Sequence, residues 1–294
     1  MKLRHGQAVA LMVLVTAMWS IAGAVTRQLE AARSFEVTFW RSLFTLLSLL
    51  FILPLWQGRG VFARMPWRSR YFWLSGVCWS VMFTAFMVAL TLTAVANVLI
   101  TMALGPLITA LFTRVALRHP LPWRTWGAIV VAGGGIAWMY GSQLSVGAPN
   151  FLTGSLVAFC VPMAAAVQWT LVQKSHAEGL DLDLVPSVMV GAAISSAVTL
   201  PLALPLQASA HDMALLAGLG LFQLAIPCAL SVVCARVLKA PEVSLLALLE
   251  IVFGILLAWL GAGEAPQASV LLGGVLVLGA LVLNEWLGWR NKHV

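Results

Sequence analysis

Ten long apolar runs fill most of this 294-residue chain, and they restrict its fold more than any other feature. Each run has about 20 residues, the length that an α-helix needs to cross the hydrocarbon core of a bilayer. Backbone polar groups cannot face lipid unpaired, so we expect helices, and the alternating ten-residue strands of a membrane barrel are absent from the sequence. The expected spans are residues 7–26, 35–57, 71–92, 94–116, 123–142, 151–173, 184–205, 212–235, 241–260 and 268–289.

The composition argues against an ordinary soluble enzyme. Hydrophobic residues make up 61% of the chain and charged residues only 9%, whereas a soluble domain carries about 25% charged residues. The ten spans leave only short loops and tails, with no room for a soluble domain. The cysteines have neither disulfide nor zinc-ligand spacing and lie inside apolar runs, so we expect buried apolar side chains and no metal site. They are Cys78, Cys160, Cys228 and Cys234.

The net charge of +7 comes from basic residues in the short loops between spans, which indicates a bilayer surface as partner and no nucleic acid. Positive residues gather on the cytoplasmic side of membrane proteins, so both termini are expected in the cytoplasm. The inner set is Lys2, Arg4, Arg59, Arg64, Arg68, Arg70, Arg114, Arg118, Arg124, Lys174, Arg236, Lys239, Arg290 and Lys292. Only Arg27 and Arg33 fall outside, and Arg41 falls inside the second span.

The N-terminus could be read as a cleaved secretory signal, because Lys2 and Arg4 precede an apolar run that contains Ala22-Gly23-Ala24. The run 7–26 is, however, long enough to cross a bilayer, and it has a counterpart later in the chain. We therefore expect a retained first span.

The chain contains an internal repeat. Leu104-Gly105-Pro106-Leu107 in the fourth span aligns with Leu249-Glu250-Ile251-Val252 in the ninth when the sequence is shifted by 145 residues. This predicts two five-span repeats, residues 1–147 and 148–294. An odd number of spans per repeat gives the repeats opposite orientations, a plan used by secondary transporters whose substrate site lies near the bilayer midplane. The expected fold is an all-α polytopic membrane protein of ten transmembrane helices in two inverted repeats.

This organisation resembles the drug/metabolite transporter superfamily, in its ten-span EamA-type exporter branch, and most of all the YddG-type aromatic amino acid exporters. The resemblance rests on the repeat, on Trp19-Ser20, on Phe39-Trp40-Arg41-Ser42, and on Gly105-Pro106 and Glu250-Ile251, where the family often has Glu-Pro. Gly105 replaces the first acid and Ile251 the second proline, which argues against a mechanism that needs both acids or both prolines. The resemblance implies an exporter in a bacterial-type inner membrane.

Glu250, about midway along the ninth expected span, is the clearest case of an ionisable residue deep in a span, and Arg41 in the second span is the other candidate. Charge at such a depth is costly and usually faces a cavity or the bundle interior. Glu250 either carries a proton or binds a substrate amine, or it is a hydrogen-bonded packing residue. Arg41 lies about 9 Å from the outer end of its span. It either attracts a substrate carboxylate or acts as an interfacial anchor beside Glu36.

The other candidates for a substrate cavity are deep aromatic residues and neutral polar residues. Indole rings with Met and Phe suit a flat apolar ligand, and Pro227, one turn after Gln223, frees a backbone carbonyl that a ligand could touch. Packing between helices is the alternative role for each of them. The full candidate set is Trp19, Trp40, Arg41, Trp79, Met82, Asn97, Gln168, Trp169, Gln223, Ser244 and Glu250.

The sequence favours a secondary transporter that exports aromatic and large apolar amino acids by alternating access, with no cofactor, since no GxxxxGK[ST] motif is present. Proton antiport through Glu250 and facilitated efflux are both compatible with these residues. A broad drug or metabolite exporter is the alternative within transport. An intramembrane enzyme is disfavoured because the five histidines lie in loops or tails and HExxH is absent. A receptor would need an extramembrane domain, and a two-fold repeat does not suggest a channel.

Overall fold

The computed structural model describes residues 3–26, 28–32, 34–93, 95–117, 121–141, 150–180, 182–262 and 268–290. All regular secondary structure in these ranges is helical, as the apolar runs predict. In chain order the helices are α1 (His5–Trp19), α2 (Ile21–Thr26), α3 (Ser34–Gln57), α4 (Val61–Arg64), α5 (Arg70–Leu92), α6 (Val95–Met102), α7 (Gly105–Leu117), α8 (Trp123–Tyr140), α9 (Phe151–Ala177), α10 (Ser187–Ala203), α11 (Ala210–Gly218), the π-helix η2 (Leu219–Ala225), α12 (Ile226–Cys234), α13 (Ala240–Ala247), α14 (Leu249–Ala262) and α15 (Ala268–Arg290).

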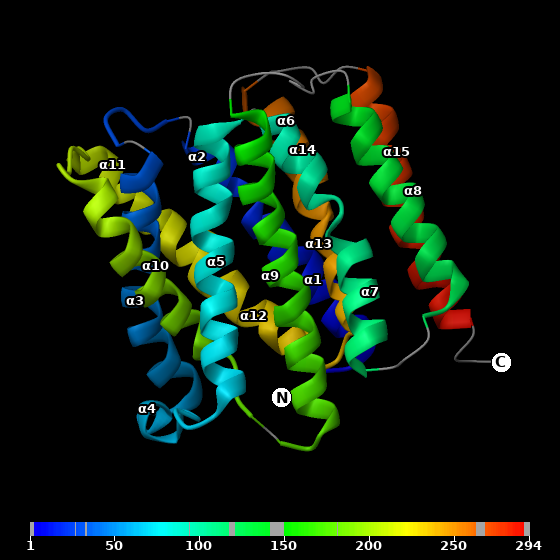
Figure 1. Cartoon of the computed structure of the whole chain (residues 1–294), viewed down its shortest axis with the longest axis horizontal. Helices are drawn as coiled ribbons and strands as arrows, with labels where there is room; N and C mark the ends of the chain where they lie inside the picture. Colours follow the sequence, from blue (N-terminus) through cyan, green and yellow to red (C-terminus); the bar gives the residue numbers. More distant parts are fainter. Residues whose placement is uncertain are drawn as a thin grey trace.

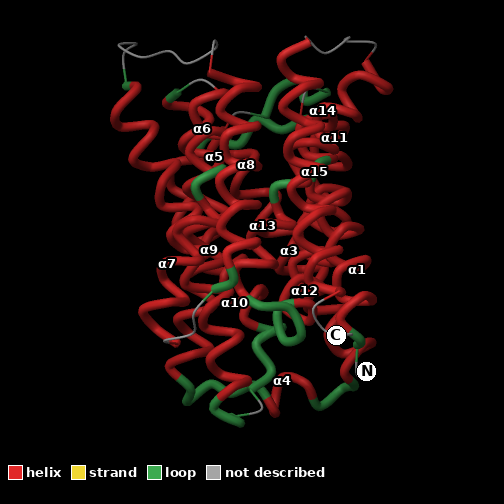
Figure 2. Tube along the Cα trace, turned by 90° about the vertical axis from the view of Figure 1, so that its right-hand side faces the viewer, coloured by secondary structure: helices red, strands yellow, loops and turns green. Residues whose placement is uncertain are grey.

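The long helices stand side by side and cross the full height of the molecule (Figures 1 and 2). Within the described ranges, seven segments can cross a membrane by length and composition, and two shorter helices are also apolar, α10 and the part of α15 at Ala268–Asn284. Every predicted span is helical over most of its length, which confirms the all-α polytopic membrane fold.

α1 begins and α15 ends at the same end of the bundle, the lower one in Figure 1. The short helix α4 and its basic neighbours Arg59, Arg64 and Arg68 lie at this end too, so we call it the basic end. The opposite end carries the loop 28–32 before α3 and the loop 204–209 before α11.

Two buried carboxylates tie these loops down at the opposite end. The Asp212 side chain of α11 accepts hydrogen bonds from the backbone N–H groups of residues 30–32, at 2.8–2.9 Å. Glu36 Oε1 of α3 accepts hydrogen bonds from the N–H groups of residues 207 and 208, both at 2.8 Å. Each carboxylate therefore holds the loop that leads into the other carboxylate's helix, which satisfies buried backbone donors that no helix pairs.

Three of the ten expected spans are divided into two helices: the first between α1 and α2, the fourth between α6 and α7, and the ninth between α13 and α14. The eighth stays helical throughout but contains the π-helical turn η2. Adding the 145-residue shift of the sequence alignment to Ala103, where the fourth span breaks, gives Leu248, where the ninth breaks. This coincidence supports the division at residues 147 and 148, which stays a prediction.

Helices α8 and α15 form a closely packed antiparallel pair, seen at the right of Figure 1. A Cβ placed on Gly135 would lie 2.9 Å from the carbonyl oxygen of Gly273, so only glycine lets the two backbones approach this closely. Thr125 Oγ1 donates a hydrogen bond to Asn284 Oδ1 at 3.2 Å near the basic end. The neighbouring Gly134 lies outside the contact, because a Cβ there would meet nothing within 4 Å.

Helix α10 packs through the small residues that the sequence repeats every fourth position. Ser187 Oγ lies 2.6 Å from Ser75 Oγ of α5, and Ser195 Oγ lies 2.9 Å from Ser42 Oγ of α3. A Cβ on Gly191 between them would lie 2.8 Å from the carbonyl oxygen of Gly76. These contacts place α10 against α3 and α5, as expected for small polar residues at a helix interface in a membrane.

Candidate functional site

A cavity lies in the middle of the bundle, where the broken helices meet. Its empty volume, which includes the open space at its mouth, is about 970 Å³. Its wall is formed by Trp19, Arg41, Trp79, Met82, Phe83, Phe86, Met102, Gly105, Val161, Pro162, Ala165, Trp169, Gln223, Leu224, Cys228, Ser244, Ala247, Leu248, Glu250 and Ile251. Most of these side chains are apolar, so a ligand here would be largely desolvated.

Aromatic rings make one side of the cavity. The Trp79 and Trp169 rings meet edge to face, with centroids 5.7 Å apart and planes at 83°. Phe83 lies at the same 5.7 Å from Trp79 at an angle of 37°. The two helices that carry these rings, α5 and α9, are packed along much of their length. Such edge-to-face pairs hold each other in place and leave ring faces for another flat group.

Arg41 is buried in the cavity wall rather than at the membrane surface. Its Nη2 donates a hydrogen bond to Gln223 Oε1 at 2.7 Å, and its Nη1 lies 2.9 Å from Met87 Sδ. Its Nε is buried and has no hydrogen-bond partner among the described residues. Glu36 instead bonds Trp40 and the loop 204–209, so of the two expected roles the cavity-facing one matches the geometry.

The π-helix η2 brings Gln223 to Arg41. Gly220 lets η2 approach α3, because a Cβ there would lie 2.9 Å from the backbone nitrogen of Thr45. Thr45 Oγ1 also donates to the Gly220 carbonyl at 3.2 Å. Gln223 Nε2 in turn donates to the Trp19 carbonyl at 3.4 Å, where α1 ends. A π-helical turn inside a helix is rare and often marks a functional site.

Glu250 is the one acidic residue among the described residues of the cavity wall. It is the second residue of α14, directly after the break at Leu248, and its side chain is half-buried. Among the described residues no hydrogen bond or ion pair to its carboxylate is found, and Arg41 is not within 4.0 Å of it. The cavity thus holds one carboxylate and one guanidinium that face the same space without neutralising each other directly.

The first residue of α7 enters the cavity from the equivalent break in the fourth span. A Cβ on Gly105 would be 3.5 Å from Ser244 Oγ and 3.6 Å from Pro162 Cβ. In the repeat alignment Gly105 is the counterpart of Glu250. It lies beside the hydroxyl group of Ser244 in α13. Residues at both breaks, Gly105 and Leu248, thus line the same cavity.

Eight of the eleven residues predicted for a substrate cavity line this one: Trp19, Arg41, Trp79, Met82, Trp169, Gln223, Ser244 and Glu250. Three predicted residues do not. Trp40 packs on Phe44 and donates to Glu36 at 3.2 Å, and Asn97 Nδ2 donates to Thr93 Oγ1 at 2.6 Å. Gln168 is fully buried one position before Trp169, and its carbonyl accepts from Ser75 Oγ at 2.8 Å.

The sequence prediction omitted the cavity's apolar members, such as Met102, Val161, Ala165 and Cys228. These residues carry no signal that separates a cavity wall from a lipid-facing surface, because both are apolar. Pro162 lines the cavity from inside the continuous helix α9. Gly105 was named in the sequence for the repeat and for the family resemblance, and not as a cavity residue.

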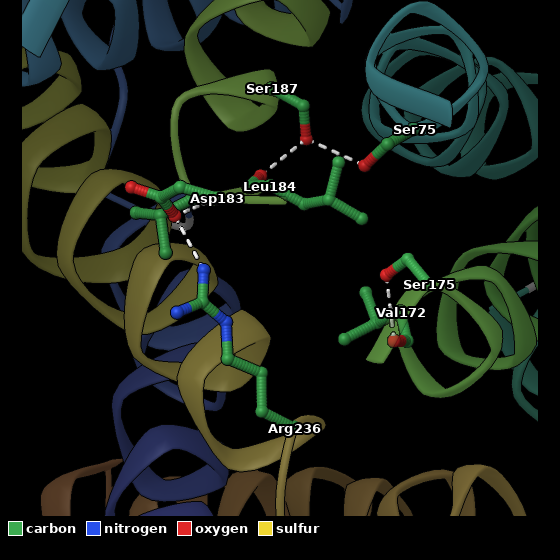
Figure 3. A network of polar contacts seen from close by, with 8 residues as sticks. Ser75, Val172, Ser175, Asp183, Leu184, Ser187 and Arg236 are labelled. Atoms are coloured by element: carbon green, nitrogen blue, oxygen red, sulfur yellow. Dashed lines mark hydrogen bonds and ion pairs between the residues drawn. The ribbon is translucent and has the colours of Figure 1, made fainter. Parts of the chain in front are cut away.

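Figure 3 shows polar contacts that join α10 to α5 and to the loop before α10, and that join this loop to Arg236 after α12. Ser187 Oγ contacts Ser75 and donates to the Leu184 carbonyl at 2.7 Å. Asp183 is the residue before Leu184, and its Oδ1 accepts a hydrogen bond from Arg236 Nη2 at 2.5 Å. These contacts hold the helices together between the Trp79–Trp169 pair and the basic end of the bundle.

Comparison with known proteins gives a family for part of the chain and a fold for nearly all of it. Residues 6–141 match the sequence profile of the EamA-like transporter family. A protein solved by crystallography has the same fold with a TM-score of 0.79, over 95% of this chain and 98% of that chain, at 18% sequence identity. A search of curated protein sequences finds no match.

Proposed function

We propose that the whole chain is a secondary transporter of the EamA-like type, in a bacterial-type inner membrane with both termini in the cytoplasm. The profile match over residues 6–141 and the fold likeness over 95% of the chain support the family. The concentration of Lys and Arg in the loops of one end supports the orientation, because positive loops stay in the cytoplasm.

The proposed substrates are aromatic and large apolar amino acids, as for YddG-type exporters. The observation that carries this is the pairing, in one cavity, of two opposite charges with an indole wall. Glu250 offers a carboxylate for an α-ammonium group, and the buried Arg41 offers a guanidinium for an α-carboxylate. Trp79 and Trp169 offer ring surfaces for the side chain.

Transport would proceed by alternating access, with the two five-span halves rocking around the cavity. The Arg41–Gln223 bond joins a residue of each half inside the cavity, so a substrate that competes for Arg41 would loosen a contact between the halves. Glu250 could exchange a proton for substrate, or flux could simply follow the substrate gradient.

Substrate counterflow in proteoliposomes tests the assignment, with labelled Trp, Phe, Tyr, Thr, Met and Glu presented to the purified protein. Uptake restricted to Trp, Phe, Tyr and Met supports it. Folded protein that takes up none of these amino acids contradicts the substrate assignment.

A broad-specificity exporter of apolar drugs is the second candidate, because most of the cavity wall is apolar. Unlike amino acid export, drug export would not need the charges of Arg41 and Glu250. Transport of uncharged aromatic compounds that survives loss of both Arg41 and Glu250 would favour it over amino acid export.

A further inference from the structure

A second cavity lies at the basic end, between the beginnings of α1, α8 and α13 and the last part of α15, and its empty volume is about 640 Å³. The helix ends that line it lie toward the lower right of Figure 1. None of its lining residues lines the central cavity, so the transport site does not account for it.

Arg124, in the first turn of α8, gives this cavity a specific chemistry. Its Nε and Nη1 are buried, and neither has a hydrogen-bond partner among the described residues. Buried N–H donors on a charged group are costly when they lack an acceptor. The planar guanidinium presents paired N–H groups at the spacing of two phosphate oxygens.

In the part of the chain that the structure describes, the other charged groups of the cavity do not pair with Arg124, so its guanidinium is free to bind an anion from outside the protein. Glu242 is the one acidic residue among the described lining residues, and its Oε1 lies 2.7 Å from His5 Nε2. Its Oε2 accepts from the backbone N–H of Lys239 at 3.2 Å. The side chain of Lys239 is exposed and adds a second cation to the wall.

The cavity lies where a lipid headgroup would be. Trp123, next to Arg124, is 89% exposed, and an exposed tryptophan at a span end usually sits at headgroup level. The outer face of α8 above it is apolar, with Val130 69% exposed. In the proposed orientation this end contacts the cytoplasmic leaflet, whose anionic lipids attract basic pockets between spans.

We propose that this cavity binds the phosphate group of an anionic phospholipid, with Arg124 as its main ligand and Lys239 as a second cation. An inorganic phosphate ion would offer the same oxygens, and it is the alternative source of the ligand. The lipid is favoured because the cavity borders an apolar, exposed helix face.

The test uses the full chain, purified in detergent and stripped of lipid. Native mass spectrometry measures bound phosphatidylglycerol, cardiolipin and, as the neutral comparison, phosphatidylcholine, with and without inorganic phosphate as competitor. The variants are Arg124→Gln and Lys239→Gln. The control is Arg114→Gln, the same charge change at an exposed basic residue of α7 outside the cavity.

Anionic lipid retained by the wild type and by Arg114→Gln, with binding about fivefold weaker or more in Arg124→Gln, supports the proposal. If Arg124→Gln does not fold, a loss of about fivefold in Lys239→Gln carries the same conclusion. Displacement of the lipid by inorganic phosphate at equal concentration overturns the lipid assignment. Equal lipid binding in all folded variants overturns the site. None of these measurements uses transport, so they are independent of the proposed substrate.

Discussion

Arg41 of α3 and Gln223 of η2 are 182 residues apart in the chain, and a 2.7 Å hydrogen bond joins their side chains in the wall of the central cavity. Two irregular features make this contact. The π-helical turn directs Gln223 inward, and Gly220 lets η2 lie against α3. Gln223 thus holds one end of the guanidinium that we propose to bind the substrate carboxylate.

The substitution Gln223→Leu removes the acceptor and leaves the buried Nη2 donor of Arg41 unpaired. This lowers the free energy of unfolding by about 1–3 kcal/mol. We expect a lower melting temperature and a raised KM for amino acid counterflow. Gln207→Leu, at an exposed position of the loop 204–209, is the control and should match the wild type in both. An unchanged KM in a folded Gln223→Leu protein would separate this bond from substrate binding.

Glu250→Gln keeps the shape of the side chain and removes its charge. We expect counterflow of tryptophan to fall about tenfold or more, because a charge-assisted hydrogen bond to the α-ammonium group contributes about 1.5–3 kcal/mol. Inhibition by indolepropionate, which has no amine, should change little. Glu30→Gln, exposed at the opposite end, is the control.

The same variant distinguishes the two modes of coupling. If the protein is a proton antiporter through Glu250, Glu250→Gln abolishes the pH dependence of transport. If the pH dependence of transport is the same in the variant as in the wild type, Glu250 does not couple proton movement to transport.

The α8–α15 pair gives a test of packing with an adjacent control. Gly135→Ala places a Cβ 2.9 Å from the Gly273 carbonyl oxygen and 3.1 Å from Leu276 Cβ. Such overpacking costs about 1–3 kcal/mol, so the melting temperature should fall. Gly134→Ala meets nothing within 4 Å and should leave it unchanged or raise it, since Ala favours a helix. Equal melting temperatures for the two variants would mean that the helices do not cross at Gly135.

The helices were predictable because lipid requires helical spans of a certain length, and apolar runs of that length are plain in the sequence. The breaks were not predictable by the same argument. Pro162 lies in an unbroken helix, whereas the fourth span breaks directly before Gly105-Pro106, where α7 begins. The ninth span breaks at Leu248, between an alanine and a leucine with no helix-breaking chemistry, and only the internal repeat, which aligns Leu248 with Ala103, held information about that position.

The charged members of the cavity were predictable because a charge in a span needs a polar space. Neutral polar residues have more ways to be satisfied. Asn97 of α6 bonds Thr93, the residue that caps α5, and the side-chain oxygen of Gln168 bonds Ser75 on α5, so both residues have polar contacts outside the cavity. Trp40 is a similar case among the aromatic residues. Its indole N–H donates a hydrogen bond to Glu36, outside the cavity.

Asp212→Asn tests the anchoring of the loop 28–32. An amide has one acceptor oxygen in place of two, while three backbone N–H groups of the loop and that of Ser209 converge on the carboxylate. We expect a lower melting temperature and faster proteolysis of this loop. Glu30→Gln, which lies in the loop but offers only its backbone to Asp212, should behave as the wild type. A protease pattern that Asp212→Asn leaves unaltered would show that the loop is held by other contacts.

Trp169→Ala tests whether the tryptophan pair selects the substrate side chain. Trp169 is 3% exposed and contacts Trp79 edge to face, so its removal widens the cavity and frees the partner ring. An aromatic contact is worth about 0.5–1.5 kcal/mol beyond its buried area, so tryptophan counterflow should weaken by up to about tenfold, and methionine counterflow by less. Trp169→Phe should restore part of the difference, because a ring returns. Trp138→Ala, on the exposed face of α8, is the control for the loss of an indole. If Trp169→Ala weakens tryptophan and methionine equally, Trp169 shapes the cavity without recognising the aromatic side chain, and selectivity has to come from the remaining rings.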